Sequence, residues 1–481
     1  MAGKKFKPTR TETDTLGRVN VPRDAYWGAQ TQRAIENFPP CGMKFPPVLF
    51  HALGYIKLAC AMVNADIGLL DKRLAGAIIR ASGMVARGRL DDQFPVGIFQ
   101  TGSGTSTNMN ANEVIATRAN EILSGRKMRN TKHPVHPNDH VNMGQSSNDV
   151  IPSAIHLASL ILLNERLLPS LTRLQKSLKK KSALLKSVVK TGRTHLMDAM
   201  PITMGQEISG WAAQVEYCIR RTRSTVPRLS ELAIGGTAVG TGINAHPEFG
   251  KRVSKALSEL TGIRLREARN HFQAQASQET VLELSGMLKT TASAFMKIAN
   301  DLRLMASGPA SGLNEIRLKT LQPGSSIMPG KVNPVLPEAV RMMGAQVMGN
   351  DLAIAIAGSM GEFELNAMLP VIANGILQSI TLISNAALLL ARTVDGFEVN
   401  TEHIANTLGD NPVIAAVLNP VIGYDTAAIV VRKALESGRP VKEVVVEMGY
   451  LGKKEAEKIL DPEAMTHSGR AMGKRQGARK S

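Results

Sequence analysis

The chain has 481 residues and is poor in aromatic side chains and in cysteine. Phe, Trp and Tyr make up 4% of the chain, whereas Met reaches 22 and Gly 42. A core of aliphatic residues and Met favours packed helices over sandwiches built on β-branched and aromatic residues. Cys41, Cys60 and Cys218 are odd in number and far apart, which predicts free thiols in a reducing compartment and not a disulfide framework.

The sequence also predicts neither a targeting segment nor a membrane-spanning segment. The N-terminus carries charge but no apolar h-region, which argues against a secretory signal, and Lys4 to Arg10 has no amphipathic period. We find no run of about eighteen apolar residues that would span a membrane. These absences predict a cytoplasmic protein that does not bind a membrane.

The chain is strongly basic, with a formal net charge of +18 from 58 basic and 40 acidic residues. Such a balance brings nucleic-acid binding into consideration. Part of the excess lies near the two ends, which are expected to be solvated tails. The sequence has no zinc-finger spacing, RNA-binding aromatic motif or basic region with heptads. We therefore expect no nucleic-acid partner, and the charge is more simply explained by attraction of an anionic substrate.

Long apolar stretches at helical spacing dominate the middle of the chain. We expect helices at residues 152–189, 203–226, 277–306, 336–357 and 371–396. These lengths exceed the usual mean of about 11–12 residues, and helices apolar over most of their surface must be covered by other helices. The fold class predicted is mainly all-α, with a long helical bundle. Pro152 is expected at the first helical position, Pro169 is expected to kink its helix, and Pro227 to follow the end of the second helix.

The composition changes on either side of this region. Residues 11–50 are rich in Pro, Gly and polar groups and are expected to be irregular, and 92–148 to be mostly loop with a helix after Asn108. After Asn400 the helices become shorter, and Asp425 is expected to cap one of them. We predict three domains, at residues 1–146, 147–400 and 401–481, the last with a basic tail from about residue 468.

The stretch from Gly324 to Pro334 is the most informative segment. Its sequence GSSIMPGKVNP holds four glycine or proline positions, two serines, a lysine and an asparagine. Glycine and proline exclude a regular helix or central strand, which leaves a polar, cationic loop that could surround a small dianion. Ser325 is a candidate nucleophile or base and Lys331 a fixed positive charge. A plain glycine-rich connector is the alternative.

Two polar clusters precede expected helices. Ser103, between two glycines, and Thr105, after the second, could bind a carboxylate, although a helix cap and turn is the simpler explanation. Ser146, Ser147 and Asn148 are expected near the N-terminus of a long helix, where free N–H groups and the dipole favour an anion; capping alone explains them equally well. Asp149 would oppose a bare anion there unless it caps the helix or turns away.

Three histidines and one glutamate are further candidate site residues. His136 and His140 have i,i+4 spacing, but Pro137 lies between them and no third ligand is evident, so we predict no metal site. Most histidines are structural, but His195 lies in a Thr-His pair in a tight polar turn before a helix. Glu338 could orient its imidazole, or it could be a carboxylate that only favours a helix start.

Taken together, these clusters resemble those of class II fumarase in the fumarase/aspartase superfamily, over nearly the whole chain. The loop at 324–334 carries the superfamily signature. The remaining matching segments are Asp14–Gly17, Gly28–Arg33, Gly235–Gly242, Gly361–Asn366 and Leu418–Asp425.

The resemblance implies a three-domain fumarase/aspartase-like fold whose long central bundle is shared across a homotetramer, with composite active sites that each take segments from three subunits. It implies reversible hydration of fumarate to L-malate, a step of the tricarboxylic acid cycle, without metal or organic cofactor. Ser325 would be the base and Glu338 would stand behind His195. The implied ligands of the dicarboxylate are Ser103, Thr105, Ser146, Ser147, Asn148, Thr194, Lys331 and Asn333. A secondary anion site would use His136, Asn138 and Asp139.

Aspartate ammonia-lyase, which shares the fold and the base, is the alternative. Thr101–Gly104, Ser146–Asn148 and Gly361–Asn366 resemble fumarase. Ser106 departs from the Gln usual in fumarases, and Val335–Glu338 leans toward the ammonia-lyase form. We therefore expect fumarase, with the ammonia-lyase as the competing hypothesis.

Overall fold

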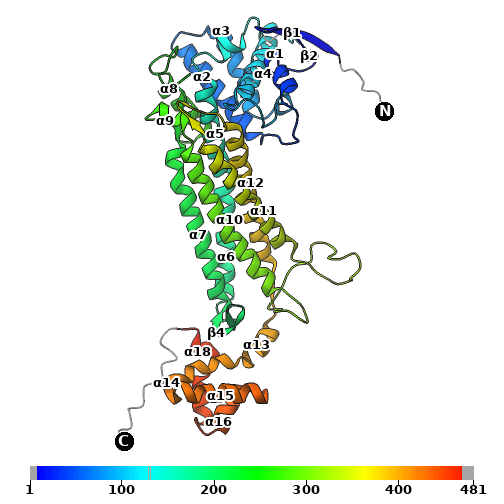
Figure 1. Cartoon of the computed structure of the whole chain (residues 1–481), viewed down its shortest axis with the longest axis vertical. Coiled ribbons are helices and arrows are strands. Elements are labelled where there is room, and N and C mark those ends of the chain that lie inside the picture. Colours follow the sequence, from blue (N-terminus) through cyan, green and yellow to red (C-terminus); the bar gives the residue numbers. More distant parts are fainter. Residues whose placement is uncertain (1–7, 128, 130–131, 468–481) are drawn as a thin grey trace. The chain divides into compact units, whose positions relative to one another are not determined.

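The computed structural model describes residues 8–127, 129 and 132–467 (Figure 1). Most of these residues are helical, and every sheet among them has only two strands. The prediction of a mainly all-α chain is confirmed. The basic tail expected from about residue 468, and the lysines before residue 8, lie outside the described residues.

The chain divides into two compact units, each made of three separate stretches. Unit 1 comprises Met1–Ser170, Cys218–Ser293 and Met343–Asn385, and unit 2 comprises Leu171–Tyr217, Ala294–Met342 and Ala386–Ser481. Five long helices contribute residues to both units: α6 (Leu168–Leu184), α7 (Met204–Leu229), α10 (Glu279–Met305), α11 (Val335–Gly358) and α12 (Leu369–Gly396). The three sequence segments predicted as domains stay a prediction.

Unit 1 contains a hairpin, several helices and short turns around an apolar core. The elements confined to it are β1 (Thr9–Asp14), β2 (Gly17–Pro22), α1 (Ala29–Asn37), α2 (Val48–Asp66), α3 (Lys72–Ala86), η1 (Asp91–Gln93), α4 (Thr105–Ser124), η2 (Pro137–Val141), α5 (Ser147–Leu162), η3 (Leu163–Leu167), β5 (Glu231–Leu232), α8 (Phe249–Thr261), β6 (Arg266–Glu267), α9 (His271–Ala276), β8 (Gly361–Glu362) and β9 (Leu365–Asn366). Helix α2 packs on α3, α5 and α8.

Unit 2 combines a two-stranded hairpin with the short C-terminal helices. The elements confined to it are β3 (Val189–Thr194), β4 (Met197–Thr203), β7 (Ile316–Arg317), β10 (Glu398–Val399), α13 (Thr401–Gly409), η4 (Pro412–Leu418), α14 (Asn419–Ile422), α15 (Tyr424–Ser437), α16 (Val441–Glu447), α17 (Lys453–Ile459) and α18 (Pro462–Met465). Residues 414–460 form their own apolar cluster. Helix α15 begins at Tyr424, so Asp425 lies in its first turn and does not cap it.

The long helices agree with the predicted positions, but the prolines do not mark their ends. Helix α5 begins at Ser147, capped by Ser146, so Pro152 lies inside it and the prediction that Pro152 is the first helical residue is wrong. The π-helical turn η3 ends two residues before Pro169, and its wider backbone accommodates a residue without an N–H. Helix α7 continues past Pro227, because Ser230 N still donates to the carbonyl of residue 226 (3.0 Å).

The N-terminal lead-in is more regular than the composition indicates. Residues 9–22 form the antiparallel hairpin β1–β2. The Arg10 guanidinium donates to the backbone carbonyls of Pro22, Ala25 and Trp27 at 2.7–2.9 Å, so Arg10 is part of the fold and not of a solvated tail. The expectation of an irregular segment at 11–50 is therefore wrong for this part, because a hairpin needs little apolar patterning when an arginine side chain holds its base.

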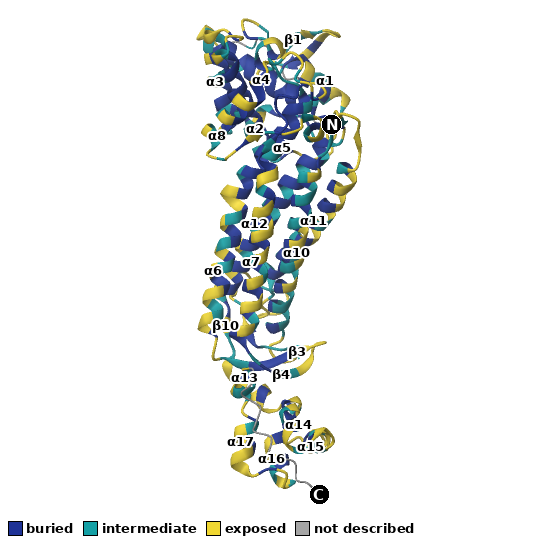
Figure 2. Cartoon of the chain, turned by 90° about the vertical axis from the view of Figure 1, so that its left-hand side faces the viewer, coloured by how far each residue is buried: buried dark blue, intermediate teal, exposed yellow. Residues whose placement is uncertain are grey.

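Three helices are long and apolar enough to cross a membrane by length and composition: Val48–Asp66, Ser147–Leu184 and Leu369–Gly396. By this measure, the expectation that no segment reaches that length is wrong. Most of each apolar window is buried inside the protein, at 78%, 78% and 61%. Figure 2 shows buried residues in α2 and α5 and a mixture of buried and exposed residues along α12. Packing within the protein accounts for the apolar character of these helices.

Candidate active site

The turn before α4 holds two of the predicted site residues. Gly104, which precedes α4, has a left-handed backbone with φ 71°, and Ser103 Oγ lies 2.7 Å from Thr105 Oγ1. A Cβ on Gly102 would meet the carbonyl oxygen of residue 367 at 1.9 Å, so the turn is closely packed against that backbone. On its other side, a Cβ on Gly104 would lie 3.1 Å from the side chain of Ile151 on α5. The turn therefore lies against the first part of α5.

Ser146, Ser147 and Asn148 do lie at a helix N-terminus, that of α5. Ser146 Oγ accepts a hydrogen bond from Asn148 N (3.2 Å), and Asp149 Oδ1 accepts one from Ser146 N (2.9 Å), which makes a capping box. Ser147 Oγ accepts a hydrogen bond from Asn108 Nδ2 on α4 (3.2 Å). The first turns of α4 and α5 are thus directly connected, and the N-terminal dipole of α5 favours an anion beside them.

Asp149 does not oppose an anion at this place, because its carboxylate is turned inward. The residue is fully buried, and its second oxygen accepts from Gly235 N (3.1 Å) and Thr237 N (3.0 Å). Burial raises the pKa of Asp149 to about 6, against the three backbone amides that lower it. Asn148 Nδ2 donates to Ala238 O (2.8 Å). The segment 235–238 therefore holds the side chains of both Asn148 and Asp149.

The residues predicted for a secondary anion site form a compact turn of their own. His136 Nδ1 accepts from Asn138 N (3.3 Å) and Asp139 N (3.2 Å) at the start of η2. His136 N donates to His140 Nδ1 (2.8 Å), so these two histidines cap the turn through separate contacts. Burial lowers the pKa of His136 from its ordinary value. Within the described residues, no group of three or more His, Cys, Asp or Glu side chains is arranged to hold a metal ion.

Thr194 and His195 lie at the tip of the hairpin β3–β4, just before α7. His195 and Leu196 have φ values of 57° and 61°, so two residues other than glycine take left-handed conformations in the turn. Such conformations cost roughly 1–3 kcal/mol each and persist where the surrounding structure holds them. Thr194 and His195 are both exposed. The predicted tight polar turn before a helix is confirmed, although the sequence did not indicate that strands flank it.

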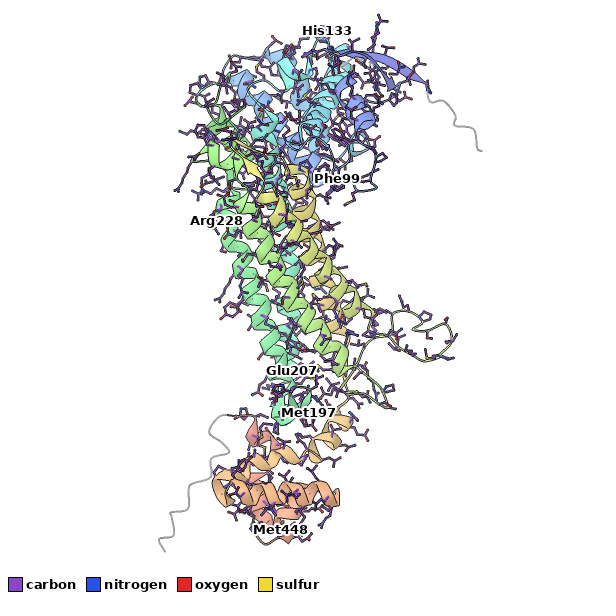
Figure 3. All side chains as sticks on the ribbon, viewed as in Figure 1. Phe99, His133, Met197, Glu207, Arg228 and Met448 are labelled. Atoms are coloured by element: carbon purple, nitrogen blue, oxygen red, sulfur yellow. The ribbon has the colours of Figure 1, made fainter. Side chains whose placement is uncertain are left out.

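A buried ion-pair group braces this hairpin. Lys190 Nζ lies 2.6 Å from Glu315 Oε2 and 2.9 Å from Glu207 Oε2, and Arg193 Nη1 lies 2.6 Å from Glu315 Oε1. The side chains of Lys190 and Glu315 are 2% and 3% exposed. Figure 3 labels Glu207 near the start of α7 and Met197 on β4. Glu315 precedes β7 and the loop that contains Ser325, so one carboxylate joins the hairpin to the start of that loop.

The loop 324–334 is closed at its neck and exposed at its tip. Ser325 Oγ accepts hydrogen bonds from Ile327 N (3.3 Å) and Met328 N (3.1 Å). Asn333 Nδ2 donates to Gly324 O, and a Cβ on Gly324 would lie 1.6 Å from the carbonyl oxygen of Lys331. Only glycine fits where the two ends of the loop cross. The neck therefore keeps Ser325 near the Lys331–Asn333 segment.

Glu338 lies in the first turn of α11, where its N–H donates to Pro334 O (3.1 Å). Over residues 8–127, 129 and 132–467, the structure gives neither its carboxylate nor the His195 imidazole a hydrogen-bond or ion-pair partner. Both belong to unit 2, yet one chain does not form the predicted His195–Glu338 pair. The pair stays a prediction.

The predicted residues thus fall into two sets. Unit 1 holds Ser103, Thr105, Ser146, Ser147 and Asn148, together with His136, Asn138 and Asp139; unit 2 holds Thr194, His195, Ser325, Lys331, Asn333 and Glu338. The first set offers a helix N-terminus, hydroxyls and amides that can bind a carboxylate. The second offers an imidazole, an ammonium and a serine oxygen that already accepts two amides.

Two family models match the chain. One, described as lyase, matches residues 17–349 and so includes every predicted site residue, and one described as fumarase C C-terminus matches residues 414–467. A class II fumarate hydratase from Xylella fastidiosa is 52% identical over 461 residues, which is 96% of each chain. The chain belongs to the class II fumarase family.

Other class II fumarases are similar to this chain over nearly the same length, in sequence and in structure. The class II fumarate hydratase of Halobacterium salinarum is 53% identical over 461 residues, covering 96% of this chain and 97% of that protein. A crystal structure of recombinant class II fumarase from Schistosoma mansoni matches with a TM-score of 0.92 and 38% identity, covering 95% and 99% of the two chains. The fumarase/aspartase-like fold and the resemblance to class II fumarase are confirmed.

Several residues that position the site were not found from the sequence. Asn108 holds Ser147, Lys57 holds Asn142 and Gln145, and Glu315 braces the His195 hairpin. Their partners are far away in the chain, which local patterns do not reveal. Lys57 did carry a signal, because it is the one charged residue between Leu53 and Ala65 on an apolar helix.

Proposed function

We propose that this chain is a fumarate hydratase, a hydro-lyase that converts fumarate and water to L-malate and catalyses the reverse reaction. The observation that carries the proposal is the match to class II fumarate hydratases at about half identity along nearly the whole chain. The substrate is a small dicarboxylate. We further propose that the enzyme acts in the cytoplasm and needs neither a metal nor an organic cofactor.

Binding of one substrate carboxylate is assigned to the first turns of α4 and α5. Ser146, Ser147 and Asn148 present hydroxyl, amide and backbone N–H groups at a helix N-terminus, with Thr105 and Ser103 packed beside them. The inward orientation of the Asp149 carboxylate leaves this surface free of an opposing charge. Lys331, Asn333 and Thr194 are proposed to hold the remaining oxygens.

Proton removal is assigned to Ser325. Abstraction of the C–H proton beside a carboxylate creates a carbanion that is stabilised as a doubly charged enediolate, and one preorganised donor can stabilise such charge by roughly 3 kcal/mol. Serine is a weak base at its ordinary pKa and needs help to lose its proton. The amides of Ile327 and Met328 donate to Ser325 Oγ and would favour its oxyanion, and Lys331 adds a positive charge to the same loop. His195 would serve the hydroxyl that comes from water on the opposite face, which gives anti addition.

Complete sites are proposed to form in a homotetramer, each from segments of three subunits. Exposed apolar side chains on the long helices support this, because a monomer would leave them in water. On α11, Met342 is 68% and Leu352 63% exposed, and Ile356 on the same helix is 50% exposed. Light scattering on the full chain tests this point, and a monomeric mass in an active preparation would contradict it.

The activity is tested by following the ultraviolet absorbance of fumarate with fumarate, L-malate and L-aspartate in turn. Loss of signal from fumarate and its appearance from malate are expected. Signal from aspartate but none from malate would favour the ammonia-lyase and overturn the proposal.

The base is tested with Ser325→Ala, which is expected to abolish turnover and to leave the oligomer intact. Ser326→Ala is the matched control, since it removes the neighbouring hydroxyl in the same loop, one that does not accept the two amides. Near-normal turnover by Ser325→Ala would exclude Ser325 as the base.

A further inference from the structure

Lys57 is a fully buried lysine in the middle of helix α2. Its ammonium nitrogen donates to two neutral oxygens, Asn142 Oδ1 and Gln145 Oε1, each at 2.9 Å. In the described parts of the chain no carboxylate lies within 4 Å of it. An ammonium in such a place is costly unless a negative charge lies nearby, so its position between α2 and the turn at 141–145 calls for a function.

The turn at 141–145 is organised around this lysine. Asn142 Oδ1 accepts hydrogen bonds from Lys57 and also from Asn108 Nδ2 (3.3 Å) and Asn112 Nδ2 (3.2 Å). Asn142 Nδ2 in turn donates to the backbone carbonyl of Gln145 (3.1 Å). The cation on α2 therefore lies against a cluster of amide side chains from α4 and the segment that leads into α5.

This cluster leads directly to the proposed carboxylate ligands. Gln145 is the residue before Ser146, and Asn108 donates both to Asn142 and to Ser147 Oγ. Two hydrogen-bonded residues, Asn142 and Asn108, thus connect Lys57 to the hydroxyl of Ser147. Removal of the lysine would take away the donor to Gln145 Oε1 and one of the donors to Asn142 Oδ1, and would loosen the turn that sets the first residues of α5.

The charge of Lys57 depends on its surroundings. Burial lowers the pKa of Lys57 to about 7, and the carboxylate of Asp149 on α5 acts in the opposite direction. Burial raises the pKa of the Cys60 thiol, so it stays neutral, and Asp149 is already held by three backbone amides. A dicarboxylate at the N-terminus of α5 would add negative charge on this side and favour the ammonium.

We propose that Lys57 is a positioning residue of the dicarboxylate site, which sets Ser146–Asn148 through Asn142 and Gln145 and takes up a proton when the dianion binds. This proposal rests on the proposed function, because it requires that a dicarboxylate binds beside α5. Linkage fixes the sign: the empty protein loses the ammonium as pH rises through about 7, so substrate binding weakens above that pH.

The test uses Lys57→Met in the full-length protein, with Cys60→Ala as the matched control on the same helix. KM and kcat for L-malate are measured between about pH 6 and pH 9. For Lys57→Met we expect KM to rise about tenfold at low pH, as for a lost hydrogen bond to a charged group, with kcat less affected. The wild-type rise of KM above about pH 7 should disappear in this variant. Cys60→Ala should keep the wild-type profile.

Calorimetry with succinate, a dicarboxylate that cannot undergo the reaction, gives an independent measure. In buffers of different ionisation enthalpy, the wild type should take up protons on binding at about pH 7.5, and Lys57→Met should not. Equal proton uptake by both proteins, or an unchanged KM profile in Lys57→Met, would overturn the proposal. If Lys57→Met does not fold, absence of proton uptake by the wild type would still overturn it. A wild type inactive on malate and fumarate would instead contradict the proposed function.

Discussion

Replacement of Glu315 by Gln is expected to weaken the protein and its catalysis together. The Glu315 carboxylate lies 2.6 Å from Lys190 Nζ and 2.6 Å from Arg193 Nη1. Both of these basic residues belong to the hairpin β3–β4, whose tip carries Thr194 and His195. Glutamine keeps the size of the side chain and removes its charge. Lys190 would then keep the Glu207 carboxylate as a partner, at 2.9 Å. Arg193 would lose the carboxylate that lies 2.6 Å from its guanidinium.

The magnitude follows from burial. Breaking a buried ion pair costs about 3–5 kcal/mol, because the remaining charge is left without compensation. Two features place Glu315→Gln near the lower limit, at about 3 kcal/mol: Lys190 keeps one carboxylate, and the Arg193 side chain is 18% exposed and so partly hydrated. Glu207→Gln removes the other partner of the same lysine. Since the side chain of Glu207 is 25% exposed, we expect about 1 kcal/mol for it.

The assay compares chemical denaturation of wild type and both variants at one protein concentration, because the stability of an oligomer depends on concentration. Fumarate turnover is measured in parallel. Glu315→Gln should lose more stability than Glu207→Gln and should lower kcat, since the backbone of residues 194–196 is held in left-handed conformations by its surroundings. A loss below about 1 kcal/mol for Glu315→Gln, or equal losses in both variants, would refute the reasoning.

Two further predictions concern the loop and the start of α5. Gly324→Ala should abolish fumarate turnover with little change in melting temperature, because its Cβ would lie 1.6 Å from the Lys331 carbonyl oxygen in an otherwise exposed loop; normal turnover would show that the neck is not needed. Burial raises the pKa of Asp149 from 3.8 to about 6, so its contribution to stability is complete below about pH 4 and is lost as pH rises through about 6. Asp149→Asn should therefore flatten the decline in unfolding free energy across this window, measured by denaturation at pH 4, 5 and 6; a parallel decline in both proteins would contradict this.

The long helices could be predicted because their signal is repeated over many residues. Apolar spacing located all five to within a few residues, and only their ends were misjudged. Pro152 and Pro227 lie inside α5 and α7, since a single missing N–H bond near an end is outweighed by the capping box at Ser146 and by continued helical hydrogen bonds. The hairpin at 189–203 was not predicted, because its strands are short and lack regular alternation.

The site could be predicted as a set of segments, but not as a geometry. Motifs indicated which segments carry the hydroxyls, amides and charges proposed for the substrate site, and their assignment to that site stays a prediction. Which groups are turned inward depends on contacts over long separations, such as Asp149 with Gly235, or Arg193 with Glu315, 122 residues apart. Such contacts leave no local pattern, so Glu315 became visible as a positioning residue only in the structure, whereas Lys57 carried the signal of a single charge on an apolar helix.

The contacts of Asn148 and Asp149 also determine when the start of α5 can reach its final structure during synthesis. Their partners Gly235, Thr237 and Ala238 follow 86 to 90 residues later in the chain. While the ribosome is still synthesising that stretch, helix α5 can have its local capping box but not the three hydrogen bonds that fix its first turn. The nascent chain therefore completes the contacts at the start of α5 only after residue 238 has emerged, and until then the carboxylate of Asp149 stays available to water and to other partners.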